Sequence, residues 1–196
     1  MEKNTTAQPN ENEKTTWQSF WELVRFAFIA LLVVIPVRFF LAEPFVVSGS
    51  SMFPTFENAD YLIVDKISYR LDKPERDDVV VFKYPPNPKK FLIKRIIGLP
   101  EETVDIKNNT ITIFNDEYID GFVLNEPYIK EMQTNTTHLT LKDDEYFVMG
   151  DNRNASSDSR YWGPLQRKFI TGRALLRLLP INDIDFMPGD YKQQVN

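Results

Sequence analysis

The 196-residue chain contains no cysteine, one histidine and only 7 glycines. Without cysteine it has no disulfide framework, no thiolate metal site and no cysteine nucleophile. His138 alone cannot supply the cluster of imidazoles that holds a catalytic metal, and no dinucleotide, P-loop or zinc-protease motif occurs. We therefore expect no metal and no cofactor. The net charge of −5 argues against a nucleic-acid partner, which needs a basic face.

The composition changes abruptly near the start of the chain. Residues 1–16 are polar and predict a disordered tail. Residues 17–43 are dense in aromatic and aliphatic side chains and predict a membrane anchor helix, followed by a single domain over residues 44–196. The uncharged run, Phe26 to Val37, is short for a hydrocarbon core about 30 Å thick. Snorkelling arginines at its two ends would extend the span to residues 23–42.

Other interpretations of this apolar stretch remain open. A cleaved signal peptide would have a similar apolar core, but the region before it is long and not net basic. A buried helix of a soluble domain, or an interfacial helix kinked at Pro36, would also be apolar. The charges before the span do not predict its orientation, because the domain after it is too long for the positive-inside rule.

From Pro44 onward, short runs rich in Val, Ile, Phe and Tyr alternate with turn residues. This pattern, without long intervening helices, predicts a mainly β domain built as a sandwich or a coiled, barrel-like sheet. The predicted strands are Tyr61–Ile67, Val79–Tyr84, Phe91–Leu99, Val104–Lys107, Thr110–Asn115, Tyr146–Met149 and Ala174–Leu179.

Two segments could supply a nucleophile and a base. Residues 48–55, Ser-Gly-Ser-Ser-Met-Phe-Pro-Thr, predict an exposed turn that presents a hydroxyl, although an ordinary Ser-rich connection has the same composition. In the strand at residues 91–98, Lys94 and Arg95 point to opposite faces, so one cation meets an apolar face. Burial favours a neutral lysine, which is a general base. The alternative is an edge strand protected by charges.

A third segment, from Gly150 to Arg160, holds two Asp, two Arg and three Ser. It is either a solvated surface loop or a loop whose ion pairs hold a hydroxyl beside a base. His138 lies in a polar segment, Thr-Asn-Thr-Thr-His, and is predicted to be exposed, which leaves no histidine for a Ser-His-Asp triad.

Taken in order, these segments resemble the type I signal peptidases, membrane-anchored serine peptidases with a Ser/Lys dyad. The resemblance covers nearly all of residues 17–180 and is closest to the compact, single-span members. It is carried by residues 48–55, Arg76–Pro85 (Arg-Asp-Asp-Val-Val-Val-Phe-Lys-Tyr-Pro), Ile93–Pro100 (Ile-Lys-Arg-Ile-Ile-Gly-Leu-Pro), Gly150–Gly163 (Gly-Asp-Asn-Arg … Ser-Arg-Tyr-Trp-Gly) and Gly172–Ala174.

The resemblance implies a role for each matching residue. Ser51 would be the nucleophile, Lys94 the general base and Ser156 the hydroxyl that orients the lysine amine. The loop residues that would maintain the architecture of the site are Asp151, Arg153, Asp158 and Arg160. The shallow pockets for small side chains, matching a preference for Ala-x-Ala before the cut, would be lined by Phe45, Val47, Met52, Phe56, Leu92 and Ile93.

The resemblance also implies partners and a location. The substrates would be preproteins that carry signal peptides, each added as a strand beside residues 45–48, and the enzyme would sit in the cell membrane with its catalytic domain on the extracytoplasmic side. The sequence departs from the family pattern at three positions. Gly49 replaces a serine that completes the oxyanion hole in some members, which leaves the second donor unassigned. Asp77 and Glu101 replace glycines in turns.

Two other functions remain open. A membrane-tethered, non-catalytic β-domain that binds exported chains would keep the anchor and tolerate loss of Ser51. A self-cleaving Ser/Lys peptidase of the repressor type would share the dyad but is expected to carry a DNA-binding domain. Cleavage by the wild type and by Ser51→Ala distinguishes an enzyme from a binder.

Overall fold

The computed structural model describes residues 16–36, 41–129 and 136–191. Apart from Thr16, the predicted tail lies outside the described residues. The chain divides into two compact units, residues 1–39 and 40–196, which are described separately.

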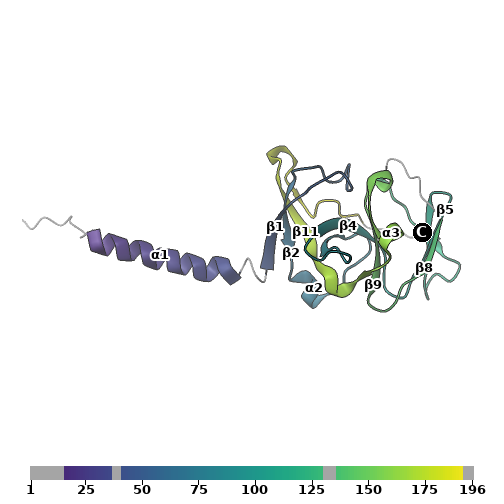
Figure 1. Ribbon diagram of the computed structural model, residues 1–196, viewed down its shortest axis with the longest axis horizontal. Helices are drawn as coiled ribbons and strands as arrows, with labels where there is room; N and C mark the ends of the chain where they lie inside the picture. Colours follow the sequence, from purple (N-terminus) through teal and green to yellow (C-terminus); the bar gives the residue numbers. More distant parts are fainter. Residues whose placement is uncertain (1–15, 37–40, 130–135, 192–196) are drawn as a thin grey trace, which may run out of the picture. The chain divides into compact units, whose positions relative to one another are not determined.

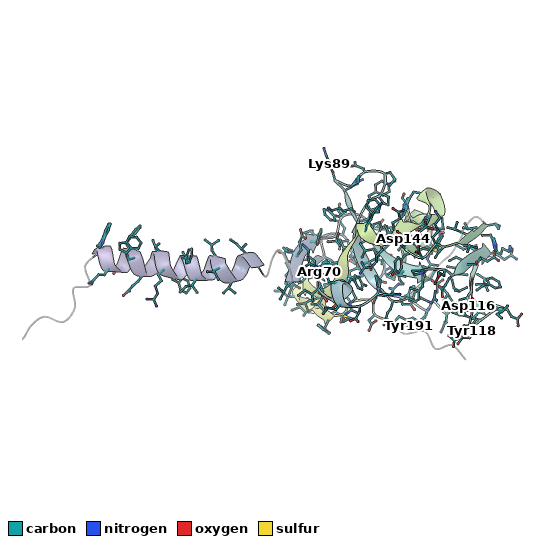
Figure 2. The ribbon with its side chains drawn as sticks, turned by 90° about the horizontal axis from the view of Figure 1, so that it is seen from below. Arg70, Lys89, Asp116, Tyr118, Asp144 and Tyr191 are labelled. Atoms are coloured by element: carbon teal, nitrogen blue, oxygen red, sulfur yellow. The ribbon has the colours of Figure 1, made fainter. Side chains whose placement is uncertain are left out.

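The first unit contains the helix α1, Thr16–Pro36. Its stretch Trp17–Ile35 is long and apolar enough to cross a membrane. Side chains project from it on opposite sides in Figure 2, and its large apolar residues are exposed. The predicted anchor range ends too late, because Ala42 and Glu43 already belong to the first strand.

The second unit is mainly β, as predicted, with neighbouring strands antiparallel (Figure 1). Within the described residues, the larger sheet has eight strands in the order β1-β2-β11-β3-β4-β9-β10, with β12 paired to β11. These strands are β1 Ala42–Val46, β2 Tyr61–Asp65, β3 Val79–Lys83, β4 Phe91–Gly98, β9 Glu145–Met149, β10 Leu165–Gln166, β11 Ile170–Leu179 and β12 Asp185–Phe186.

The larger sheet coils back on itself. Three strands separate β1 from β4 in the sheet order, yet the rings of Phe45 on β1 and Phe91 on β4 have centroids 5.1 Å apart. The predicted coiled sheet is therefore confirmed. The coil encloses a core cluster of Val47, Met52, Phe56, Leu62, Val79 and Ala174.

A smaller sheet of four described strands, in the order β7-β6-β5-β8, lies on the far side of the unit from β1 (Figure 1). Its strands are β5 Thr103–Lys107, β6 Thr110–Phe114, β7 Phe122–Val123 and β8 Thr137–Thr140. Alternation on β6 buries Ile111 and Ile113 against Phe147 and Met149 of β9. Short helices complete the unit: α2 Ser68–Leu71, α3 Ser159–Trp162 and the 3₁₀ turns Arg153–Ala155, Arg167–Phe169 and Ile181–Asp183.

All seven predicted strands exist, with ends within a few residues of those expected. The unpredicted β1, β7, β8, β10 and β12 are short or polar, or continue an apolar run, so alternation does not mark them. Asp77 and Glu101 have φ values of 69° and 67°. This left-handed conformation is easiest for glycine, so Asp77 and Glu101 each adopt a backbone conformation that side chains disfavour.

Candidate active site

Ser51 lies in a tight turn that follows β1. The amide of Phe53 donates to the Ser50 carbonyl at 3.1 Å, and the amide of Phe56 donates to the Met52 carbonyl at 2.9 Å. Met52 and Phe56 are fully buried and join the core cluster beneath the turn. The apolar anchors therefore hold the backbone of the turn rigid, while the Ser51 hydroxyl stays at the surface of the core.

Lys94 reaches this hydroxyl from β4. Its Nζ donates to Ser51 Oγ at 2.7 Å and to the Ile93 carbonyl at 2.8 Å. Lys94 is 2% exposed and Arg95, on the opposite face, is fully buried. The edge-strand alternative is wrong, because both cations are buried and β4 pairs with β3 on one side and, from Arg95 onward, with β9 on the other.

The surroundings of Lys94 suit a base. Burial lowers the pKa of its amine to about 8, and the negative charges of Asp158 and Asp151 only partly offset this. An amine with this pKa is partly neutral near neutral pH and lies within proton-transfer distance of a hydroxyl.

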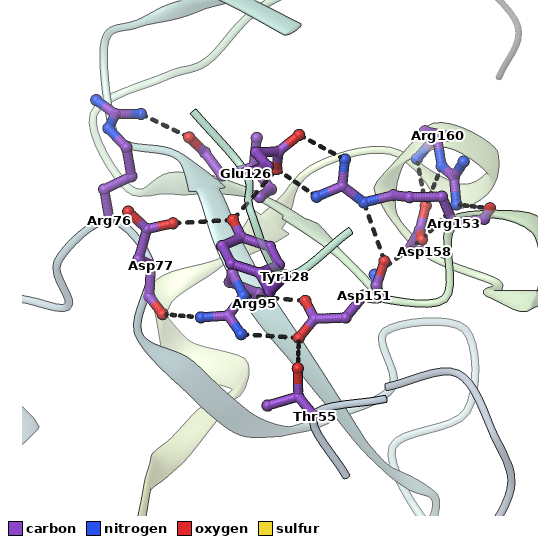
Figure 3. A network of polar contacts seen from close by, with 12 residues as sticks. Thr55, Arg76, Asp77, Arg95, Glu126, Tyr128, Asp151, Arg153, Asp158 and Arg160 are labelled. Carbon is purple, nitrogen blue, oxygen red and sulfur yellow. Dashed lines mark hydrogen bonds and ion pairs between the residues drawn. The ribbon is translucent and has the colours of Figure 1, made fainter. Parts of the chain in front are cut away.

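The buried charge of Arg95 is stabilised by an ion pair with Asp151. Its Nε and Nη2 donate to the Asp151 carboxylate at 2.9 and 2.7 Å, and Thr55 Oγ1 donates to the same carboxylate at 2.5 Å (Figure 3). Burial alone would lower the pKa of Arg95, but the hydrogen bonds and charge of Asp151 outweigh this effect. The net pKa is raised, so the guanidinium stays charged.

The other loop residues are paired as well. Arg160 donates from Nε and Nη2 to Asp158, both at 2.8 Å, and Asp158 also accepts the Gly150 amide at 3.1 Å (Figure 3). Arg153 Nε donates to the Gly150 carbonyl at 3.1 Å. Asp151, Arg153 and Asp158 are at most 2% exposed, so the solvated-loop alternative is wrong.

This loop is bonded directly to the turn that carries Ser51. The amide of Asn152 donates to the Ser51 carbonyl, and its side-chain Nδ2 donates to the Ser50 carbonyl, each at 3.0 Å. In a planar trans peptide the C=O and N–H point in opposite directions, so fixing the Ser50 carbonyl also fixes the Ser51 N–H. Sequence reasoning did not single out Asn152, although it lies inside the recognised loop.

Ser156 is buried beside the turn. An added Cβ at Gly150 would strike both Ser156 Oγ and the Ser51 carbonyl, which places the three groups together. Among the described residues, no hydrogen bond joins Ser156 Oγ to a partner. The predicted bond to the Lys94 amine is therefore not formed in this structure. The Gly49 amide donates to Asn58 Oδ1 at 3.0 Å, so it is already engaged.

A cavity of about 100 Å³ opens beside the Ser51 hydroxyl. Four predicted pocket residues, Phe45, Val47, Leu92 and Ile93, line it, whereas Met52 and Phe56 lie in the core below. The other lining residues, which sequence reasoning missed, are Val46, Ser48, Leu62, Val81 and Phe91, together with Ser51 and Lys94 themselves. Of the remaining candidates, His138 is 65% exposed on β8, with Nδ1 2.9 Å from Asp105 Oδ1.

A serine hydroxyl held against a buried amine, beside an apolar cavity on a rigid β scaffold, suits a hydrolase of the serine class. The comparisons with known proteins agree. Residues 20–179 match the family model described as signal peptidase, peptidase S26. The chain is 39% identical to Probable signal peptidase I-1 of Synechocystis sp. over 84% of this chain and 85% of that protein.

Two further relatives match over most of their length. Probable signal peptidase I-2 of Synechocystis sp. is 35% identical over 99% of this chain and 89% of its own, and Signal peptidase I of Bacillus amyloliquefaciens is 33% identical over 93% and 96%. The chain belongs to the signal peptidase family, peptidase S26, and is a serine endopeptidase.

Proposed function

We propose that the protein removes signal peptides from preproteins by cutting after small residues in the Ala-x-Ala pattern, with Ser51 as nucleophile and Lys94 as general base. The observation that carries this proposal is the 2.7 Å separation of Lys94 Nζ and Ser51 Oγ in a buried setting.

The chemistry follows from this pair. Neutral Lys94 takes the proton of the Ser51 hydroxyl as Oγ attacks the carbonyl carbon of the scissile peptide. The Ser51 N–H, oriented through the bond from Asn152 to the Ser50 carbonyl, donates to the oxyanion. The protonated lysine then gives its proton to the leaving amine. Water, deprotonated by Lys94, attacks the carbonyl carbon of the acyl-enzyme. The protonated lysine then returns the proton to Ser51 Oγ as the ester bond breaks, which releases the acid product and restores the free enzyme.

The cavity supports the choice of substrate. Its small volume and apolar walls suit short side chains, and it lies between β1 and the first half of β4. In this half, Phe91 and Leu92 pair only with β3, because β9 pairs with β4 from Arg95 onward. An extended peptide therefore fits beside residues 45–48, where main-chain hydrogen bonds hold it and alternate side chains enter the cavity.

The remaining predicted roles belong to the same proposal. Asp151, Arg153, Asp158 and Arg160 hold the loop that carries Asn152, and Ser156 turns toward the Lys94 amine when substrate is bound. The helix α1 anchors the enzyme in the cell membrane, with the catalytic unit on the extracytoplasmic side where signal peptides emerge.

The test is cleavage of a preprotein whose signal ends in Ala-x-Ala, by the detergent-solubilised full chain. Ser51→Ala and Lys94→Met should each lower the cleavage rate by at least about 1,000-fold, because each removes one half of a two-residue catalytic unit. The matched controls are Ser50→Ala, an exposed serine of the same turn, and Lys89→Met. Lys89 lies on the turn between β3 and β4 and is exposed (Figure 2). Both controls should cleave like the wild type.

Any of three results would contradict the proposal. Full cleavage by a folded Ser51→Ala variant would mean that Ser51 is not the nucleophile. An inert wild type would favour the alternative of a tethered β-domain that only binds exported chains. Replacing the small residue before the cut by Phe should stop cleavage, and continued cleavage would exclude the assigned pocket.

A further inference from the structure

The segment Leu124–Ile129 lies against the catalytic loop, although it belongs to none of the recognised motifs. It follows β7 of the smaller sheet, where Leu124 is buried and its amide donates to the Ile111 carbonyl at 2.9 Å. A turn bond from the Ile129 amide to the Glu126 carbonyl, 3.0 Å long, shapes the rest. Of the side chains of this turn, Glu126 faces Arg153 of the loop, and the ring of Tyr128 lies over Arg95 of β4 (Figure 3).

Glu126 pairs with Arg153 at two points. Arg153 Nη1 donates to Glu126 Oε2 at 2.8 Å, and Nη2 donates to Oε1. The Arg153 side chain is fully buried and the Glu126 side chain is 10% exposed. A buried, bidentate pair of this kind fixes the guanidinium in position and orientation. Because Arg153 Nε also holds the Gly150 carbonyl, Glu126 indirectly fixes the start of the loop.

Tyr128 covers Arg95. The guanidinium carbon lies 4.0 Å from the centre of the ring. The phenol donates to Asp77 Oδ1 at 3.1 Å and Glu126 Oε1 at 3.2 Å. Burial and the charge of Glu126 raise the pKa of Tyr128, so it stays neutral and keeps its proton. Arg95 is thus held by Asp151 at its edge and by an aromatic ring on its face.

Both arginines connect this segment to the reacting groups. Arg95 is the neighbour of Lys94 on β4 and binds Asp151, and Asp151 is followed by Asn152, whose amide donates to the Ser51 carbonyl. We infer that Glu126 and Tyr128 are positioning residues for the Ser51–Lys94 pair, holding through Arg153 and Arg95 the loop that sets the geometry of that pair. This inference rests on the proposed function.

The first experiment compares Glu126→Gln with the wild type in the full-length, detergent-solubilised enzyme. The amide keeps the size of the side chain but removes the charge that balances Arg153. We expect kcat to fall by up to about 100-fold with little change in KM, since displacement of catalytic groups affects the reaction more than binding.

The pH profile separates positioning from a general loss of structure. The charges that act on the Lys94 amine are Asp158 and Asp151, both of which favour its protonated form. In Glu126→Gln the positive charge of Arg153 is offset less and counteracts the charge of Asp151 more strongly, so Lys94 loses its proton more easily. The midpoint of the rising limb of kcat/KM should move to lower pH. Partial unfolding would lower kcat/KM by the same factor at every pH and would leave the midpoint of the profile unchanged.

A second variant, Tyr128→Leu, changes no charge and tests the inference if Glu126→Gln does not fold. Tyr128→Leu removes the ring from Arg95 and should lower kcat, and Tyr128→Phe, which retains the ring, should restore most of that loss. Glu117→Gln is the matched control, because Glu117 is an exposed carboxylate of the same sheet's turns. It should behave as the wild type.

The inference is overturned if folded Glu126→Gln and Tyr128→Leu keep the kcat and the midpoint of the wild type, or if activity falls only in proportion to the unfolded fraction measured by circular dichroism. Ser51→Ala is assayed beside them. If it remains active, the proposed function fails. If Ser51→Ala is inactive while Glu126→Gln and Tyr128→Leu are fully active, only this inference fails.

Discussion

At the scale of single residues, the neighbours Lys94 and Arg95 show two ways to bury a cation. Lys94 meets an apolar surrounding and its pKa falls, so its charged form is disfavoured. Arg95 cannot lose its proton and instead binds Asp151, the Asp77 and Gly189 carbonyls and the ring of Tyr128. One strand position therefore carries the proposed base, and the next carries a fixed support.

The lowered pKa of Lys94 predicts the pH dependence of cleavage. In the proposed mechanism the neutral amine is the reactive form, so kcat/KM should fall about tenfold per pH unit below pH 8 and reach a plateau above it. The measurement is kcat/KM from pH 6 to 10 with a peptide that does not titrate in this range. His138→Ala should leave the profile unchanged, because His138 is exposed and pairs with Asp105 on the other sheet. A kcat/KM that still rises about tenfold per pH unit up to pH 10 would contradict this prediction, because an amine whose pKa is not lowered gives that profile.

At the scale of elements, the loop after β9 and the turn after β1 pack with almost no space between them. Gly150 has its Cα beside Ser156 Oγ and the Ser51 carbonyl, so a side chain at this position has no room. The residue type at position 150 therefore sets the distance between the loop and the turn that carries Ser51.

Gly150→Ala tests this close approach. The added methyl group should separate the loop from the turn, destabilise the fold by about 1–3 kcal/mol and lower kcat more than KM rises. Chemical denaturation and cleavage kinetics measure the two effects. Ser157→Ala, an exposed change in the same loop, is the control. Wild-type kinetics in Gly150→Ala would mean that the loop and the turn can separate without affecting catalysis.

At the scale of the whole molecule, the chain combines an apolar helix with a β unit that has its own core. Soluble monomers rarely expose an apolar surface as continuous as that of α1, and a lipid bilayer would cover such a surface.

Removal of residues 1–36 tests the role of α1. The full chain should remain in the membrane pellet after an alkaline wash, while the shortened chain should appear in the supernatant. We expect the shortened chain to cleave a soluble peptide at a rate within about threefold of the full chain, because the residues of the site all lie beyond residue 41. Loss of the β unit's circular dichroism signal would instead show that the helix is needed for folding.

The sequence by itself determined the local features of this protein. Alternation and β-branched residues marked seven strands of the β unit, and the apolar run from Trp17 marked the helix. The position of Lys94 in an apolar strand predicted a base, because burial of a lysine has the same consequence in any fold. The motifs also predicted the buried loop and four residues of the cavity.

Only the tertiary structure decided what depends on contacts between distant segments. Ser51 and Lys94 are 43 residues apart and meet because the larger sheet coils and brings β1 against β4. The same packing puts Met52 and Phe56 in the core rather than in the cavity, and brings Glu126 and Tyr128 to Arg153 and Arg95. A periodic pattern in a single sequence shows which face of an element is buried. It does not show which distant strand or charged residue lies opposite, because the geometry of the folded chain determines those contacts.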